Sequence, residues 1–238
     1  MDNAGHAAET AHTEPYRACQ PTRPLLIGLV GGIGSGKSEV ARLLAERGAW
    51  VIEADRLGHE ALEQPDIRRQ VLERWGSQVA DAQGKVDRRR LAAIVFARES
   101  ERRALEQLVF PWIAQGIERE WQRAQRHPQV RVVVLDAAIL LETGWGQRCD
   151  GVIFVDAPPH MRQKRAMAQR QWSAQEWAAR EAAQWPVERK RAYARWVIDN
   201  SGSLEDLRLQ VDRIWKQLTQ EKPSESSPGL GPATAVGA

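Results

Sequence analysis

The residues with the clearest chemical pattern form the segment Gly31–Ser38, which reads Gly-Gly-Ile-Gly-Ser-Gly-Lys-Ser. An apolar run (25–30) precedes this segment, and a run typical of a helix (39–45) follows it. Glycines let the backbone turn back and direct several N–H groups at one point, where the start of the helix adds its partial positive charge. Because a chance turn rarely carries Lys-Ser between a strand and a helix, the pattern predicts a phosphate-binding loop for a nucleoside triphosphate.

Two side chains of this loop carry its expected chemistry. We expect Lys37 to reach the β- and γ-phosphates, and we expect the hydroxyl of Ser38 to ligate Mg²⁺. Backbone N–H groups complete the cradle. The residues expected to bind ATP here are Gly31, Gly32, Ile33, Gly34, Ser35, Gly36, Lys37, Ser38 and Glu39.

Carboxylates follow two further apolar runs. The run 50–52 ends in Glu53-Ala54-Asp55, and the run 131–136 ends in Asp136. The carboxyl ends of parallel strands form the edge at which α/β sheets bind ligands. Asp55 is therefore a candidate catalytic residue, unless it caps a helix that begins near Arg56. Asp136 lies where phosphate-loop proteins often keep a carboxylate for Mg²⁺ or its water shell.

Further strands and helices must position these groups. Apolar runs at 151–156 and 196–200 predict a fourth and a fifth strand, and an amphipathic helix at 204–218 closes the chain. Alternation of buried strands and helices predicts an α/β fold. The mostly helical stretch 66–127 contains no nucleotide motif, which favours a substrate-side insertion.

Details of two helical stretches can also be predicted. We expect Ser100 to cap a helix, which Pro111 should kink or restart. Ser173-Ala174-Gln175-Glu176 is a capping box, so helices should join near Trp172 and again near Pro186. Arginines are frequent between 160 and 193. Such a run usually forms a solvated face, but over a phosphate loop it favours a mobile lid.

Composition limits the class of protein. The chain has 238 residues with 42% hydrophobic and 27% charged residues, which is ordinary for a globular protein. No membrane span or secretory signal is evident, and Cys19 and Cys149 indicate no disulfide framework, so we expect a cytoplasmic protein. The formal charge of +3 is mild and the arginines alternate with acids, so we expect no nucleic-acid partner and no membrane partner.

These motifs, in this order, resemble the dephospho-CoA kinase family over about residues 25–218. The phosphate loop alone occurs in many nucleotide-binding proteins, whereas the motifs that follow it, taken together, point to this family. Val51–Asp55 is similar to the family's Val-Ile-Asp-Ala-Asp, and Leu135–Asp136 with Leu140–Glu142 is similar to its Asp…Pro-Leu-Leu-x-Glu stretch. The other matching positions are Gly84, Asp87, Arg88, Leu91, Val95, Phe96, Arg165, Arg170, Gln184 and 198–202.

The resemblance implies a P-loop kinase core with a five-stranded parallel sheet, a helical CoA-binding insertion and a helical lid. Its expected parts are a core (24–63, 130–158 and 196–220), an insertion (64–129), a lid (159–195) and disordered tails (1–23 and 221–238).

Residue roles follow from the same resemblance. Asp55 matches the catalytic base that accepts the proton of the ribose 3′-hydroxyl, and it would also contact dephospho-CoA together with Arg88 and Glu142. Arg165 and Arg170 match lid arginines that face the phosphates. Asn200 lies where the adenine of ATP is expected.

The chain also departs from the family pattern, although no departure falls in the phosphate loop or at Asp55. The departures are Glu53 for Asp, Phe110 for His, Ala138 for Pro, Gln171 for Asp and Arg195 for Asp.

The implied activity is transfer of the γ-phosphoryl group of ATP, with Mg²⁺, to the ribose 3′-hydroxyl of dephospho-CoA, by a monomer or weak homo-oligomer. Two alternatives stay open from the residues themselves. One is another small-molecule or nucleotide kinase with the same core and lid. The other is a regulatory P-loop ATPase whose output is partner binding. The sequence contains no Asn-Lys-x-Asp string, which disfavours a GTPase switch.

Overall fold

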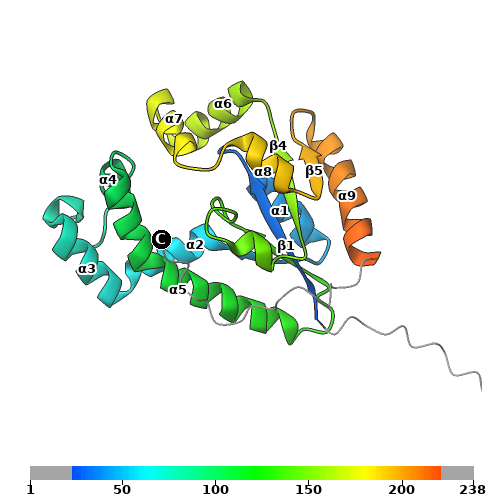
Figure 1. Cartoon of the computed structure of the whole chain (residues 1–238), viewed down its shortest axis with the longest axis horizontal. Coiled ribbons are helices and arrows are strands. Elements are labelled where there is room, and N and C mark those ends of the chain that lie inside the picture. Colours follow the sequence, from blue (N-terminus) through cyan, green and yellow to red (C-terminus); the bar gives the residue numbers. More distant parts are fainter. Residues whose placement is uncertain (1–22, 221–238) are drawn as a thin grey trace, which may run out of the picture.

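A computed structural model describes residues 23–220, so the two predicted tails lie outside the described residues, apart from Arg23. Its centre is a five-stranded sheet in which every pairing is parallel, in the order β2-β3-β1-β4-β5 (Figure 1). This confirms the predicted α/β fold. The strands are β1 (Leu25–Gly31), β2 (Trp50–Glu53), β3 (Val132–Asp136), β4 (Gly151–Asp156) and β5 (Trp196–Asp199).

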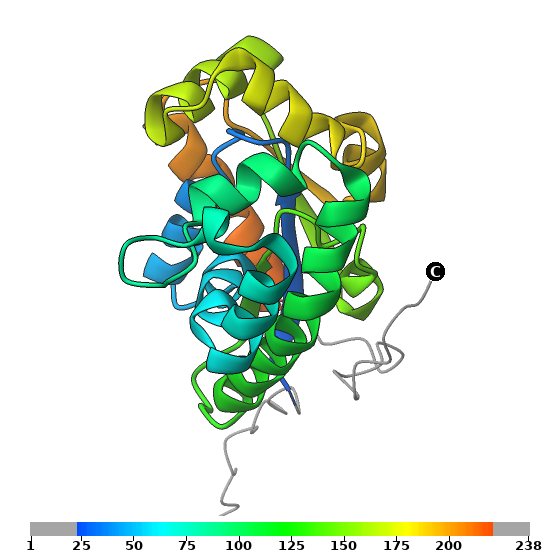
Figure 2. The ribbon, with the colours of Figure 1, turned by 90° about the vertical axis from the view of Figure 1, so that its left-hand side faces the viewer.

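Helices surround this sheet and build two further layers (Figures 1 and 2). Among residues 23–220, no helix combines the length and the apolarity that a membrane span requires. The helices are α1 (Lys37–Glu46), α2 (Ala54–Glu63), α3 (Pro65–Trp75), α4 (Arg88–Val95), α5 (Glu99–Gln125), α6 (Pro159–Arg170), α7 (Ala174–Ala182), α8 (Val187–Tyr193) and α9 (Leu204–Gln220), with short 3₁₀ turns η1 (Ser77–Val79) and η2 (Trp145–Arg148).

The central strand β1 is buried along its whole length, because helices cover both faces of the sheet. Ile27 and Leu29 belong to a core cluster that α1 and α9 complete. Leu26 and Val30, which point to the opposite face, belong to a second cluster that α2 and α5 complete. The two clusters hold the sheet between layers of helices. The loops that follow the strands are therefore the parts of the sheet that can form a site.

Helices α3 and α4 and the first half of α5 form a third core beside the sheet (Figure 2). Val71 and Trp75 of α3 pack with Leu91 and Val95 of α4. Helix α5 is 27 residues long, and its second half reaches the sheet, where Trp121 joins the second cluster. One long helix therefore attaches this part to the sheet.

Helices α6, α7 and α8 arch over the carboxyl end of the sheet (Figure 1). The predicted capping box at the start of α7 is confirmed: the Glu176 amide donates to Ser173 Oγ (3.1 Å), and the Ser173 amide donates to the Glu176 carboxylate (2.8 Å). Helix α7 has no fully buried residue. Polar and aromatic contacts must therefore hold it in place.

For α5 the predicted cap was wrong, and of the two alternatives predicted for Pro111 the restart was wrong. The helix begins at Glu99, with Arg98 before it, and Ser100 lies inside the first turn without capping it. The helix also does not restart at Pro111, which lies inside it. Proline removes one backbone hydrogen bond, but burial of Val109 and Ile117 on either side of it offsets that loss.

Candidate functional site

The glycine-rich loop joins β1 to α1 and turns tightly at two residues with positive φ. Gly34 has φ +82° and Gly36 has φ +97°, a conformation that favours glycine. A Cβ at Gly34 would also clash with the backbone of Arg162, and one at Gly36 with the side chain of Asn200. The Ser35 amide donates to the carbonyl of Gly32 (3.1 Å), which closes the turn. The loop therefore wraps in front of the N-terminus of α1, as an anion-binding loop requires.

The residue after β5 supports this loop from the side. The side-chain nitrogen of Asn200 donates to the carbonyl of Ser35 (2.7 Å), and its backbone amide donates to the carbonyl of Asp156 (2.8 Å). Asn200 is buried. Its amide nitrogen is thus engaged by the loop, a role that the sequence did not indicate.

Strand register brings the predicted carboxylates to the edge that holds the loop. Asp136, the last residue of β3, is aligned with Leu29 of β1 and with Glu53 of β2. Burial, foremost, raises the pKa of Asp136 to about 6; the charges of Asp55 and Glu53 raise it further, whereas Lys37 and Arg170 lower it. Residues of the loop, α2, β2 and α6 therefore lie within electrostatic range of Asp136.

Asp55 lies in the first turn of α2 with an exposed side chain. The helix begins at Ala54 after Glu53, and no side chain caps it, so the alternative role of Asp55 as a helix cap is wrong. Within residues 23–220, the carboxylate of Asp55 accepts no hydrogen bond and forms no ion pair. It is thus available to a ligand.

His59, one helical turn after Asp55, is a titratable residue near the candidate site that sequence reasoning did not single out. Burial lowers its pKa first, Arg88 of α4 and Arg170 of α6 lower it further, and Asp55 raises it. The start of α4 and the end of α6 therefore both lie within electrostatic range of Asp55 and His59. A sequence signal existed, since positions four apart share a helix face.

Predicted lid arginines occupy helix α6. Arg165 donates from Nη2 to the carbonyl of Asn200 (3.0 Å), while its Nη1 is buried without a hydrogen-bond partner among the described residues. Arg170, at the end of α6, stacks on Trp172, with its Cζ 4.9 Å from the ring centre. Arg165 thus keeps an unused donor beside the loop.

Arg180 of α7 contacts aromatic side chains of two different segments. Its guanidinium carbon lies 4.4 Å from the ring centre of Phe96, which follows α4, and 4.2 Å from that of Trp172. Burial lowers its pKa. Arg180 therefore connects α7 to the residue that follows α4 in this structure.

Glu142, predicted to contact the acceptor, lies beside the base of the lid. One carboxylate oxygen pairs with Lys190 of α8 (3.0 Å) and accepts from the Trp185 amide (2.8 Å). The other oxygen is buried and has no hydrogen-bond partner among the described residues. Lys190 is only 1% exposed and also donates to the carbonyl of Ala138 (3.0 Å). Burial, the largest effect, lowers the pKa of Lys190.

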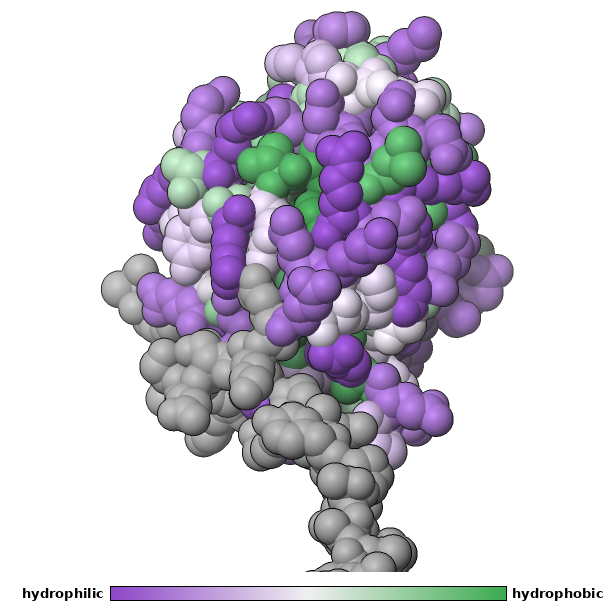
Figure 3. Space-filling model, turned by 90° about the vertical axis from the view of Figure 1, so that its right-hand side faces the viewer, coloured by the Kyte–Doolittle hydropathy of each residue, from purple (hydrophilic) through white to green (hydrophobic). Residues whose placement is uncertain are grey.

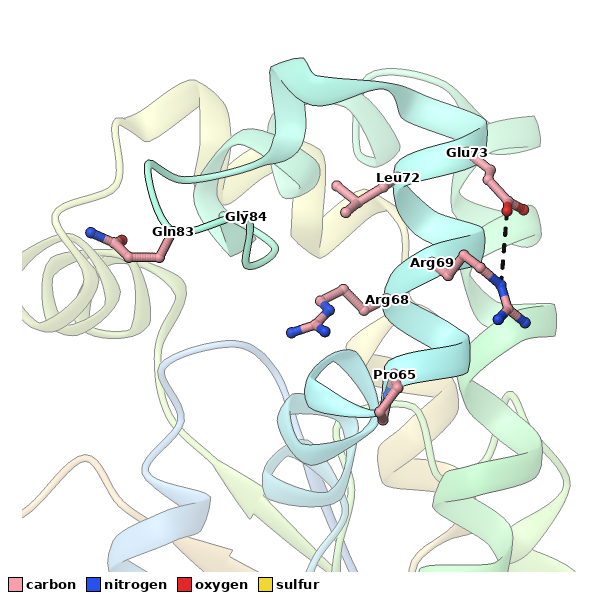
Figure 4. A pocket seen from close by; sticks show the side chains of 7 residues that line it. All are labelled: Pro65, Arg68, Arg69, Leu72, Glu73, Gln83 and Gly84. Carbon is pink, nitrogen blue, oxygen red and sulfur yellow. Dashed lines mark ion pairs between the residues drawn. The ribbon is translucent and has the colours of Figure 1, made fainter.

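A surface hollow lies away from these groups, between α3 and the turn at 81–84 (Figure 4). Arg68, Leu72 and Gln83 line it, while Arg69 turns aside to pair with Glu73 (3.8 Å). None of the residues predicted for phosphate binding or base catalysis lines this hollow. We therefore take the loop edge of the sheet as the candidate site.

The described residues contain no group of three or more His, Cys, Asp or Glu side chains that could enclose a metal ion. Mg²⁺ in phosphoryl-transfer sites is commonly held by one or two protein oxygens, with phosphates and water completing its shell. The hydroxyl of Ser38 and the carboxylate of Asp136 are oxygen donors of that kind, so the residues present fit Mg²⁺ bound together with a nucleotide.

Comparison with known proteins finds relatives along most of the chain. The sequence model of a family described as dephospho-CoA kinase matches residues 25–206. A dephospho-CoA kinase from Chlorobaculum tepidum is 40% identical over 200 residues, covering 82% of this chain and 95% of its own. One from Thermobifida fusca is 40% identical over 196 residues, covering 82% and 96%.

Solved structures show the same fold. The crystal structure of TT1252 from Thermus thermophilus superposes with a TM-score of 0.70 at 38% identity, covering 83% of this chain and 99% of that one. Dephospho-CoA kinase from Campylobacter jejuni superposes with a TM-score of 0.56 at 22% identity, covering 83% and 99%, a likeness that speaks for the fold alone.

Proposed function

The chain belongs to the dephospho-CoA kinase family, and from that premise we propose how its residues transfer the γ-phosphoryl group of ATP to dephospho-CoA. The activity of this ATP-using family is the final step of CoA biosynthesis. The single observation that carries the proposal is the strand register that brings Asp136 and Glu53 to the carboxyl edge of the sheet, the edge that holds the glycine-rich loop, with Lys37, Asp55 and Arg170 in electrostatic range of Asp136.

We assign the donor to the glycine-rich loop. Its amides and Lys37 hold the β- and γ-phosphates, with Gly31–Glu39 as the contact segment and Asn200 beside the adenine. Arg165 and Arg170 add positive charge over the transferred group. The buried, unpartnered Nη1 of Arg165 supports this assignment, because such a donor needs an acceptor when the site is filled.

Asp55 is the proposed base and a contact to the acceptor. Phosphoryl transfer requires alignment and charge neutralisation more than covalent chemistry. A carboxylate cannot deprotonate an alcohol beforehand, so Asp55 aligns the ribose 3′-hydroxyl and takes its proton late in the transfer. Its exposed and unpaired carboxylate supports this role.

Ser38 and Asp136 are the residues proposed to hold Mg²⁺, directly or through water. When bound, the ion supplies positive charge to the phosphates. Asp136 suits this position because its burial disfavours a bare negative charge, which a cation would relieve.

Arg88 and Glu142 complete the proposed acceptor site. Arg88 starts α4 within electrostatic range of His59, and Glu142 keeps one unpartnered oxygen. Closure of α6–α8 would exclude water that otherwise hydrolyses ATP. We accordingly propose the division into a core (24–63, 130–158 and 196–220), an acceptor-binding insertion (64–129) and a lid (159–195).

We also propose that the protein is cytoplasmic and acts as a monomer or weak homo-oligomer. On the side of α9 and β5, the surface is largely hydrophilic and its apolar groups are small (Figure 3). The large apolar side chains exposed on these two elements are Val197, Leu204 and Leu209. Such small groups support the absence of an extensive apolar interface on this side of the described residues.

The base assignment is tested by replacing Asp55 with Asn, which keeps the shape but cannot accept the proton. We expect kcat to fall by about 10²- to 10⁴-fold with little change in the KM for ATP, because the loop is untouched. Glu63→Gln makes the same chemical change at an exposed position of the same helix and should leave kcat unchanged. Wild-type turnover by the Asp55→Asn chain would remove the role assigned to Asp55.

A further inference from the structure

Helix α7 holds both backbone polar groups of Ile33, the third residue of the phosphate loop. The amide of Ile33 donates to Oε2 of Glu181 (3.1 Å). The carbonyl of Ile33 accepts from the indole Nε1 of Trp177 (3.4 Å). Trp177 and Glu181 are four residues apart, so they lie on the same face of α7. Helix α7 therefore forms hydrogen bonds with both the N–H and the C=O of one loop residue.

These contacts determine which way two peptide groups of the loop face. In a trans peptide the C=O and N–H point in opposite directions. Because the Ile33 amide points at Glu181, the carbonyl of Gly32 points the other way, where it accepts from the Ser35 amide (3.1 Å). Because the Ile33 carbonyl points at Trp177, the N–H of Gly34 points away from the lid. That N–H is one of the cradle amides.

The contacts are completed by a buried arginine, Arg162, which holds the two partly buried side chains of α7. Arg162 of α6 pairs with Glu181, donates to the carbonyl of Ala157 (3.1 Å) and lies over the ring of Trp177, 5.6 Å from the ring centre. The side chain of Arg162 is 6% exposed and that of Glu181 is 21% exposed. A Cβ on Gly32 would clash with the guanidinium, so α6, α7 and the loop interlock.

We propose that Trp177 and Glu181 are positioning residues, which orient the loop amides, foremost the N–H of Gly34, for the phosphates of ATP. The proposal rests on the proposed function in one respect, the assignment of Gly31–Ser38 as the phosphate loop. Donor affinity then depends on two lid side chains that act through the backbone of Ile33 and need not touch the nucleotide.

Calorimetric titration of Mg-ATP into the full chain tests this without any acceptor. Trp177→Phe removes the indole donor and keeps an aromatic ring beside Arg162, whereas Glu181→Ala removes both the acceptor of the Ile33 amide and the ion-pair partner of Arg162. Each should raise the Kd for ATP by about three- to tenfold, the effect of losing one hydrogen bond of this kind. Glu181→Gln keeps one oxygen that can accept from the Ile33 amide but loses the charge that pairs with Arg162, so its Kd for ATP should lie between those of wild type and Glu181→Ala.

The matched control is Glu188→Ala, which removes an exposed carboxylate from the neighbouring helix α8 and should leave the Kd unchanged. Thermal unfolding identifies any variant that fails to fold. If Glu181→Ala does not fold, the Kd of Trp177→Phe, the milder change, still tests whether ATP affinity depends on the contacts to Ile33.

Two results would overturn the inference: an unchanged Kd in folded Trp177→Phe and Glu181→Ala chains, or tighter ATP binding after Glu181→Ala. A purely structural role would lower kcat through a smaller active fraction and leave the Kd unchanged, which is the first of these results. A wild-type chain that binds no Mg-ATP would instead overturn the proposed function, and this inference with it.

Discussion

Asp136 shows how burial changes the protonation of a single carboxylate. It ends the buried strand β3, where the sheet and α2 remove solvent from its carboxylate. Burial of an ionised carboxylate without a cation is unfavourable, so the folded state favours the protonated form. The sequence could predict the position of Asp136 at a strand end, but not its burial, which depends on the packing of neighbouring elements.

The raised pKa of Asp136 predicts how stability varies with pH in the metal-free chain. Its pKa is 3.8 when unfolded and about 6 when folded, so between these values the unfolded state has bound fewer protons than the folded state. The contribution of Asp136 is therefore fully favourable below pH 3.8 and is lost as pH rises to about 6, a fall of about 3 kcal/mol in the free energy of unfolding.

Chemical denaturation with EDTA from pH 4 to pH 7 measures this effect. The difference between wild type and Asp136→Asn isolates it from other carboxylates, since Asn cannot titrate. The control Glu63→Gln should show the same dependence of the free energy of unfolding on pH as wild type. If the free energy of unfolding varies with pH in the same way for wild type and Asp136→Asn, the pKa of Asp136 is not raised in the folded chain.

At the scale of elements, a buried ion pair attaches α8 to the loop that follows β3. Lys190 is 1% exposed and binds Glu142, Ala138 and Gln184. Removing one partner leaves the other charge buried and unpaired, which is more harmful than losing the pair itself. The Lys190–Glu142 ion pair explains how α6–α8 can be held beside the sheet, although α7 buries no residue completely.

Lys190→Met should therefore lower the free energy of unfolding by about 3 kcal/mol, and adding Glu142→Gln should recover part of that loss. Arg103→Met breaks an exposed pair with Glu99 and should cost less than about 1 kcal/mol. Denaturant unfolding of the four chains provides the comparison. Equal losses for Lys190→Met and Arg103→Met would show that burial of the pair contributes nothing.

Local chemistry explains which elements were predictable. The capping box at Ser173 and the buried run of β1 each carry their signal within a few residues, and the structure contains both. The start of α5 at Glu99 and its continuation through Pro111 were missed. Both depend on packing between distant segments, which a local pattern does not contain.

At the scale of the whole molecule, residues of α2, α4 and α6 lie within electrostatic range of one another near the carboxyl edge of the sheet. The sequence predicted Lys37, Asp55 and Asp136 for this place, because strand ends and a glycine-rich loop have local signatures. It did not indicate the contact of Asn200 with the loop or that of Arg180 with Phe96. Those contacts join residues far apart in the chain, and only the tertiary arrangement brings them together.

The central claim is that one site transfers the terminal phosphoryl group of ATP to the ribose 3′-hydroxyl of dephospho-CoA. Its most direct test uses ATP labelled in the γ-phosphate, incubated with the full chain, Mg²⁺ and dephospho-CoA. We predict that the label enters CoA at the 3′ oxygen in an amount equal to the ADP formed. Release of the label as inorganic phosphate, with no labelled CoA, would contradict the account.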